Sequence, residues 1–195
     1  MVSLPLMRMK FLLLLLLSAL PCYAADTSTT QVPLVFSGGH DTDGRDRGRP
    51  VILIASALKV PPDVFRETFL HVHPAGPGAG GPTDAEARAN KKVLMDGLSK
   101  YGVTDERLNE VSNRYRYRKW AGELWPTREA AGYATVSNGV VTGFVITDGG
   151  FGYSSPPAVG VKDMPGVQTA ATLSFGTDFE KNGAVTAVAL AAPTK

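Results

Sequence analysis

Cysteine is nearly absent from this chain of 195 residues, which contains only Cys22. A single cysteine cannot form a disulfide bond within the chain, and no Asn-x-Ser/Thr sequon for N-glycosylation occurs. The usual features of eukaryotic secretion are therefore missing. If the chain is exported, a bacterial periplasm or exterior suits it better than a eukaryotic secretory pathway.

Long hydrophobic runs are also scarce, and the only leucine-dominated run is 11–20. Arg8 and Lys10 precede this run and the small residue Ala24 follows it, which is typical of a secretory signal peptide. The run is about ten residues long, whereas a helix needs about twenty to cross a bilayer. We therefore expect residues 1–24 to be a signal peptide, the product to be secreted or periplasmic, and the mature protein to have no membrane span.

An excess of charge is missing once this segment is set aside. Arg8 and Lys10 account for the formal net charge of +2, so the rest of the chain has equal numbers of basic and acidic residues. Binding to nucleic acid or to an acidic membrane rests on a basic excess. Nucleic acid is therefore an unexpected partner, whereas a cell-surface or extracellular protein or a glycan stays open.

Helical signals are concentrated before residue 114. Residues 25–35 are polar and rich in threonine, which predicts a flexible leader. Apolar residues then recur at helical spacing over 51–58 and again beyond a Pro-Pro turn. Thr83 and Glu86 have the spacing of a capping box at the start of a further helix. These patterns predict a small helical lobe over 36–113.

Strand signals dominate the remainder, 114–195, where β-branched residues alternate between Gly-rich turns. Asn138-Gly139 and Asn182-Gly183 each lie between such runs, and Asn-Gly favours a two-residue type I′ turn with positive φ at both positions. The runs around the two pairs are similar, which indicates two hairpins related by internal duplication. The predicted fold is α+β, with a small helical N-terminal lobe followed by an antiparallel β-hairpin repeat module.

The first of these hairpins continues into Gly149-Gly150-Phe151-Gly152-Tyr153 and then Pro156-Pro157. This part of the chain resembles a short β repeat of the form Asn-Gly-x-Val-Thr, a strand, Gly-Gly-x-Gly-Tyr, then Pro and a further strand. Many secreted bacterial proteins and some phage virion proteins have this repeat. The match covers 134–161 well and 171–192 in part, because the second copy lacks Gly-Gly-x-Gly-Tyr.

Residues 38–127 look like a block that precedes the repeat in uncharacterised secreted proteins of planctomycete-like bacteria. The resemblance implies a structural or display module and assigns no catalytic residue.

The densest cluster of candidate ligands is formed by His40, Asp41, Asp43 and Asp46. One imidazole and three carboxylates so close in sequence suit a divalent cation such as Ca²⁺ or Mg²⁺, and a metal-dependent hydrolase would use them. The commoner alternative is a surface turn, in which aspartates make Asx-turns or cap a helix while nearby arginines neutralise them. No other cofactor is indicated.

Two further histidines and one serine extend the enzyme hypothesis. His71 and His73 would join a metal site if they converged with His40, although His71 also suits a helix C-terminus, where the partial negative charge favours a cation. Ser37 near His40 and Asp41 supplies the residue types of a catalytic triad. The chain has no Gly-x-Ser-x-Gly motif to support that alternative.

The one locally basic stretch interleaves cations with aromatic residues. On a strand its tyrosines would point one way and its arginines the other, which suits a polyanion such as an acidic glycan. The alternative is a half-buried strand whose tyrosines face the core and whose arginines pair with carboxylates. Its candidate ligand-binding residues are Arg114, Tyr115, Arg116, Tyr117, Arg118 and Trp120.

These observations favour an exported, non-enzymatic structural or binding protein whose β module serves surface assembly or display. The metal-dependent hydrolase and the polyanion binder stay as alternatives from other functional classes.

Overall fold

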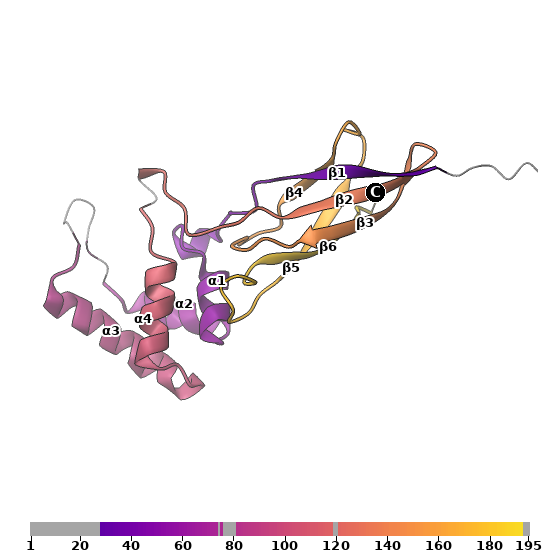
Figure 1. Cartoon of the computed structure of the whole chain (residues 1–195). Helices are drawn as coiled ribbons and strands as arrows, with labels where there is room; N and C mark the ends of the chain where they lie inside the picture. Colours follow the sequence, from indigo (N-terminus) through magenta and orange to yellow (C-terminus); the bar gives the residue numbers. More distant parts are fainter. Residues whose placement is uncertain (1–27, 74, 76–80, 119–120, 193–195) are drawn as a thin grey trace, which may run out of the picture.

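The computed structural model describes residues 28–73, 75, 81–118 and 121–192. The architecture is α+β, with α-helices between residues 51 and 114 followed by antiparallel sheets. Figure 1 shows the helices gathered at one end of the molecule and the strands extending from the other. In this part of the chain no helix is both long and apolar enough to span a membrane. The predicted signal peptide, 1–24, lies outside the described residues.

The helix over 84–98 begins at the capping box that the sequence predicts. The Thr83 hydroxyl accepts a hydrogen bond from the Glu86 backbone N–H, and the Glu86 carboxylate accepts one from the Thr83 N–H, which confirms the capping box. The helical elements are α1 (Val51–Leu58), α2 (Pro62–Leu70), α3 (Asp84–Leu98) and α4 (Asp105–Arg114), with short 3-10 helices η1 (Gly44–Asp46) and η2 (Ser99–Tyr101).

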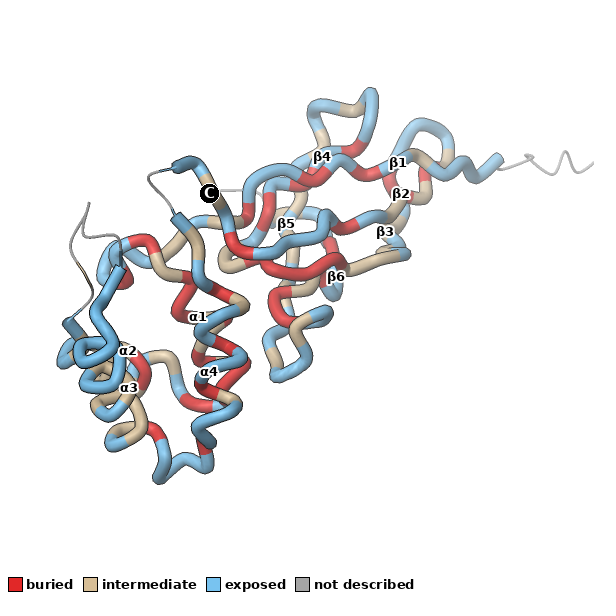
Figure 2. Tube along the Cα trace, turned by 60° about the vertical axis from the view of Figure 1, so that its left-hand side comes forward, coloured by how far each residue is buried: buried red, intermediate tan, exposed pale blue. Residues whose placement is uncertain are grey.

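The helices share one apolar core. Leu53 of α1, Leu98 of α3 and Val111 of α4 are completely buried in it. Trp125, from the chain that follows α4, packs into the same core and donates its indole N–H to the carbonyl of Gly152 at 2.7 Å. Trp125 therefore fills the seam between the helices and the sheets, and Figure 2 shows buried residues on both sides of this seam.

The strands form two antiparallel sheets that enclose a second core. The strands are β1 (Thr29–Ser37), β2 (Ala131–Ser137), β3 (Val140–Asp148), β4 (Ala158–Val161), β5 (Thr169–Ser174) and β6 (Ala184–Leu190). The first sheet has the order β3-β2-β1-β4 and curls into a half-barrel, whereas β5 and β6 pair with each other. The Val185 N–H donates to the Gly149 carbonyl at 2.8 Å, so the β5–β6 hairpin is tied to the end of β3. Side chains of both sheets meet in one buried cluster.

Strand β1 corrects the predicted flexible leader over 25–35 and the predicted start of the helical lobe at residue 36. Its first half, 29–33, pairs with β2 and its second half, 34–37, pairs with β4. Leu34 and Phe36 point into the sheet core. The leader prediction was wrong from Thr29 onward, because the strand depends on partners that lie far later in the chain.

The two Asn-Gly pairs have different structures. Asn138 and Gly139 have φ of 51° and 77°, and they join β2 directly to β3, so the predicted type I′ hairpin is confirmed. Strands β5 and β6 also form an antiparallel hairpin, but residues 175–183 connect them as a longer loop. Gly183 has φ of 71°, whereas Asn182 has no positive φ and is fully buried. The prediction of a tight turn at Asn182-Gly183 was therefore wrong, because residues 175–181, which have no counterpart in the first hairpin, lengthen the connection into a loop.

Candidate functional site

The predicted cluster of His40, Asp41, Asp43 and Asp46 lies in the segment that leads from β1 through η1 to α1. Arginines engage two of its carboxylates. Asp43 accepts from the Arg45 backbone at 2.9 Å and from its guanidinium at 2.7 Å, and these bonds hold the pKa of Asp43 well below its usual range. The buried Asp46 accepts two hydrogen bonds from a guanidinium on α2, which raises the pKa of that arginine. That arginine is Arg66, whose Nε lies 2.6 Å from Oδ1 of Asp46.

The third aspartate of the cluster is tied to the sheet module. The Ser154 hydroxyl donates to the Asp41 carbonyl at 2.7 Å, and the Asp41 N–H donates to the Ser155 hydroxyl at 3.1 Å. Among the described residues, no three His, Cys, Asp or Glu side chains are grouped so that they could hold a metal ion. His71 and His73 are both exposed at the end of α2. The metal-site hypothesis gains no geometric support, and the arginine-neutralised turn fits these contacts better.

His40 packs as an aromatic side chain at the seam. Its ring stacks on Tyr153 with centroids 5.3 Å apart, and it meets the edge of Trp125 at 6.1 Å. The Nε2 atom is buried and has no hydrogen-bond partner. Burial lowers the pKa of His40 from 6.5, and the nearby Asp41 opposes this shift only in part. The imidazole is therefore neutral at physiological pH.

Two shallow hollows flank this segment and separate the residues of the predicted triad. The larger, of about 200 Å³, is lined by Ser37 and His40 together with Thr127, Arg128, Glu129 and Tyr153. The smaller, of about 150 Å³, is lined by Asp41 and by the carboxylates that the arginines engage. Asp41 is hydrogen-bonded to serines and not to His40, so the Ser37–His40–Asp41 arrangement does not have the hydrogen bonds of a catalytic triad.

The lowered pKa of His40 predicts a pH-dependent stability. The unfolded chain binds a proton at His40 near pH 6.5 and the folded chain only at lower pH, so the contribution of His40 is fully present above about pH 6.5 and is lost as pH falls through the folded-state value. Denaturant unfolding at about pH 7.5 and about pH 5.5 should give a larger decrease for the natural chain than for His40→Gln. Equal decreases in both proteins would contradict the account of His40.

The basic and aromatic segment 114–118 is not a strand, which corrects the sequence prediction. Helix α4 continues through Arg114, and residues 115–118 have no regular structure. Tyr115 is nevertheless buried, and the Tyr117 hydroxyl donates to the Gly48 carbonyl. Arg114 pairs with Glu180 at 2.9 Å and Arg118 pairs with Glu123.

These contacts fit the alternative in which the tyrosines face the core and the arginines pair with carboxylates. Arg116 is exposed, and Trp120 lies outside the described residues. The polyanion hypothesis therefore gains little geometric support.

Asn182 is the residue that sequence reasoning missed. Its side-chain amide donates to the Leu53 carbonyl of α1 at 2.8 Å and to the Tyr115 hydroxyl at 2.9 Å. Its side-chain oxygen accepts from the Gly176 N–H at 3.1 Å. One buried side chain thus joins the β5–β6 loop to two parts of the helical region. No pattern in the sequence marks it, because the same Asn-Gly pair makes an ordinary turn at residue 138.

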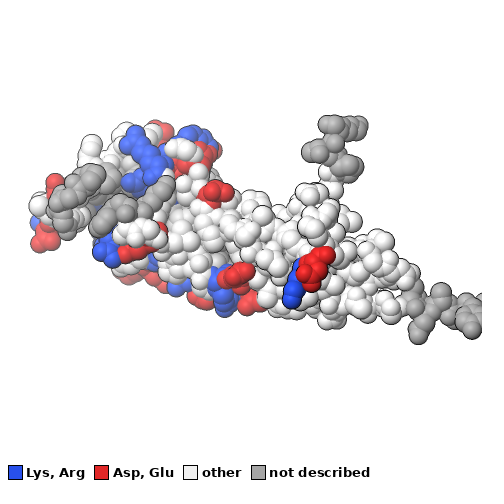
Figure 3. Space-filling model, turned by 90° about the horizontal axis from the view of Figure 1, so that it is seen from above, with Lys and Arg blue, Asp and Glu red and all other residues white. Residues whose placement is uncertain are grey.

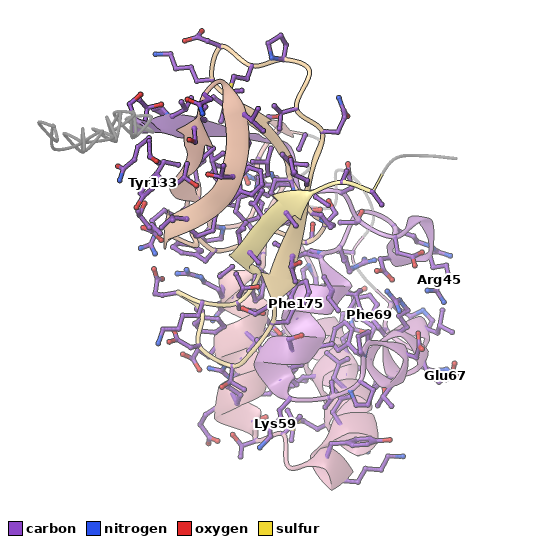
Figure 4. All side chains as sticks on the ribbon, turned by 90° about the vertical axis from the view of Figure 1, so that its right-hand side faces the viewer. Arg45, Lys59, Glu67, Phe69, Tyr133 and Phe175 are labelled. Carbon is purple, nitrogen blue, oxygen red and sulfur yellow. The ribbon has the colours of Figure 1, made fainter. Side chains whose placement is uncertain are left out.

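The outer side of the first sheet has a surface with almost no charge. Within 28–37, 131–174 and 184–192 the charged residues are Asp148, Lys162 and Asp163. Figure 3 shows Lys, Arg, Asp and Glu gathered over the helical end and sparse over the strands. Figure 4 shows Tyr133 on the outside of the strands, away from β5 and β6.

Nine outward positions of β1, β2 and β3, which we call the outer face, form three cross-strand rows. The alternate residues of these strands, such as Leu34, Ala134 and Val141, are buried, so the remaining positions point outward. The rows are Thr29–Ser137–Val140, Gln31–Thr135–Gly143 and Pro33–Tyr133–Val145. None of the nine residues carries a charge.

The likeness to a secreted β repeat rests on the β2–β3 hairpin and the turn after it, and it stays a prediction. The chain matches no family model, no curated protein and no solved structure.

Proposed function

We propose that this chain is an exported, non-enzymatic protein that binds or assembles through the outer surface of its β-hairpin repeat module. The observation that carries the proposal is the lack of charge on the exposed strands, where Asp148, Lys162 and Asp163 are the charged residues in 28–37, 131–174 and 184–192. The outer face also exposes apolar side chains, since Val140 is 64% and Val145 is 38% exposed.

Such a surface is unusual for a protein that stays free in water. Soluble β proteins place charged residues, lysine above all, on exposed strands, because charge prevents association between sheets. Here the charges are concentrated instead over the helices. A strand surface of threonine, serine, alanine and valine suits a protein whose sheets are covered by a partner.

The helical region fits the role of a rigid support for the sheets. Arg107 of α4 donates to the Ala57 carbonyl at 2.9 Å and also to the carbonyl of Thr177 in the β5–β6 loop. Trp125 and Asn182 join the same two parts through buried hydrogen bonds. Polar side chains at the junction are thus occupied in structural links, which supports a non-catalytic role more than the hydrolase alternative.

Thiol labelling of exported material tests the proposal. Cys22 lies in the predicted signal peptide, so a cysteine placed after the cleavage site is the only thiol of the mature chain. We expect Gln31→Cys, on the outer face, to react with a membrane-impermeant maleimide at least tenfold more slowly in exported material than in the purified, diluted chain. Lys92→Cys, whose natural side chain is 75% exposed on α3, is the matched control and should react equally in both. Equal labelling of Gln31→Cys in the two preparations would overturn the proposal.

A further inference from the structure

We infer that the outer face pairs with the same face of a second copy of this chain, in a two-fold symmetric, sheet-on-sheet contact. The inference rests on the proposed function and names the partner of that surface. The inference follows from the lack of charge on the nine residues, from the shape of the surface that they form, and from its area.

The lack of charge on the outer face favours a second copy as its partner. A two-fold contact places each patch against a copy of itself, so a charged residue near the axis meets its own like charge. The outer face avoids this repulsion because none of its nine residues is charged. The exposed surface of the helices is different, since it carries ion pairs such as Lys92–Asp96. The outer face is therefore the better surface for self-association.

The shape of the outer face also favours an interface. Tyr133 lies beside Val145 in one row, and tyrosine is enriched among the residues that dominate binding energy at interfaces. Gly143 lies in the next row, where the Thr135 hydroxyl occupies the space beside it, since a Cβ on Gly143 would lie 3.0 Å from Oγ1 of Thr135. Tyr133 therefore stands beside shorter side chains, and Gln31 and Ser137 supply hydrogen-bonding groups in the other rows.

The area of the outer face sets the strength of the contact. The three rows of the outer face span five residues of β1, 29–33, which corresponds to a length of about 17 Å. Three strands about 4.8 Å apart then present roughly 250 Å² from each copy, or about 500 Å² from the pair. Specific interfaces below about 1,200 Å² are weak and transient. We therefore expect a dimer that forms reversibly as concentration rises.

Sedimentation velocity tests the inference on the chain from Ala25 onward, which contains every element that the structure describes. The weight-average mass of the natural chain should rise toward that of a dimer from low micromolar to near-millimolar concentration. Val145→Lys should weaken this association at least tenfold, because it places an ammonium group in a contact that offers no opposite charge. Leu70→Lys is the matched control, since Leu70 is 69% exposed on α2, and it should associate like the natural chain. Thermal melts of both variants establish that each is folded.

A natural chain that stays monomeric at every concentration would overturn the second copy as partner, and so would equal association of the two folded variants. These outcomes are separable from failure of the proposed function. Protection of Gln31→Cys in exported material combined with a monomeric purified chain means that the face is covered by another partner, such as a neutral glycan. Loss of that protection removes the proposed function itself.

Discussion

Replacing Gly183 with valine should lower the free energy of unfolding by at least ~3 kcal/mol. Gly183 has φ of 71°, a conformation that a β-branched residue strongly resists. A Cβ at this position would overlap the backbone carbonyl of Tyr153 and lie 2.7 Å from Cδ2 of Leu53. The Tyr153 backbone cannot move away freely, because its N–H donates to the Gly183 carbonyl at 3.1 Å. Denaturant unfolding or a thermal melt measures the loss.

Gly139→Val is the matched control for this experiment. Gly139 has a similar φ of 77°, but a Cβ there would meet no atom within 4 Å. Only the backbone strain remains, so we expect a cost of about 1–2 kcal/mol. Equal losses for the two variants would mean that Gly183 is not packed between Leu53 and Tyr153.

Asn182→Ala should destabilise the fold by about 3 kcal/mol, because it removes three hydrogen bonds of a fully buried side chain. The Leu53 carbonyl and the Tyr115 hydroxyl each lose the amide that donates to them, and the Gly176 N–H loses its acceptor. Asn182 is 0% exposed, so water cannot replace these bonds without opening the structure. The measurement is the free energy of unfolding in urea, with Asn138→Ala at the exposed hairpin turn as the control.

A double-mutant cycle isolates the link from Asn182 to the helical region. Tyr115→Phe removes only the hydroxyl that accepts from the Asn182 amide. If the hydrogen bond is present, the double variant should lose less stability than the sum of the two single variants, by about 1 kcal/mol. Strict additivity would contradict the contact.

Local signals in the sequence predicted much of the fold. The capping box of Thr83 and Glu86 and the type I′ turn at Asn138-Gly139 depend on residues within four positions of each other. Strand β1 was missed because its Thr-rich sequence forms a strand only through pairing with β2 and β4. The two Asn-Gly pairs have the same local sequence but different backbone conformations, because loop length and burial determine the conformation at Asn182.

At the candidate site, too, the sequence could not show which side chains contact one another. The composition of the His40–Asp46 segment suggests a cation site. In the structure, however, Arg66 of α2 forms an ion pair with Asp46, and Tyr153 stacks on His40. These partners come from distant parts of the chain, so spacing alone could not reveal them. Alternation in 114–118 correctly placed Tyr115 inside, although the segment is not a strand. The uncharged strands were visible in the sequence, but their arrangement into one outer face required the register of β1, β2 and β3.

We propose that the outer face is the surface through which this chain meets its partner. Photo-cross-linking in the exporting cell tests it most directly, with a photoreactive amino acid placed either at Val145 on the outer face or at Leu70 on α2, both exposed positions. We expect a discrete cross-linked product from the Val145 position, with the mass of two chains if the partner is a second copy, and none from the Leu70 position. A product from the Leu70 position alone, or the absence of any product from the Val145 position, would contradict it.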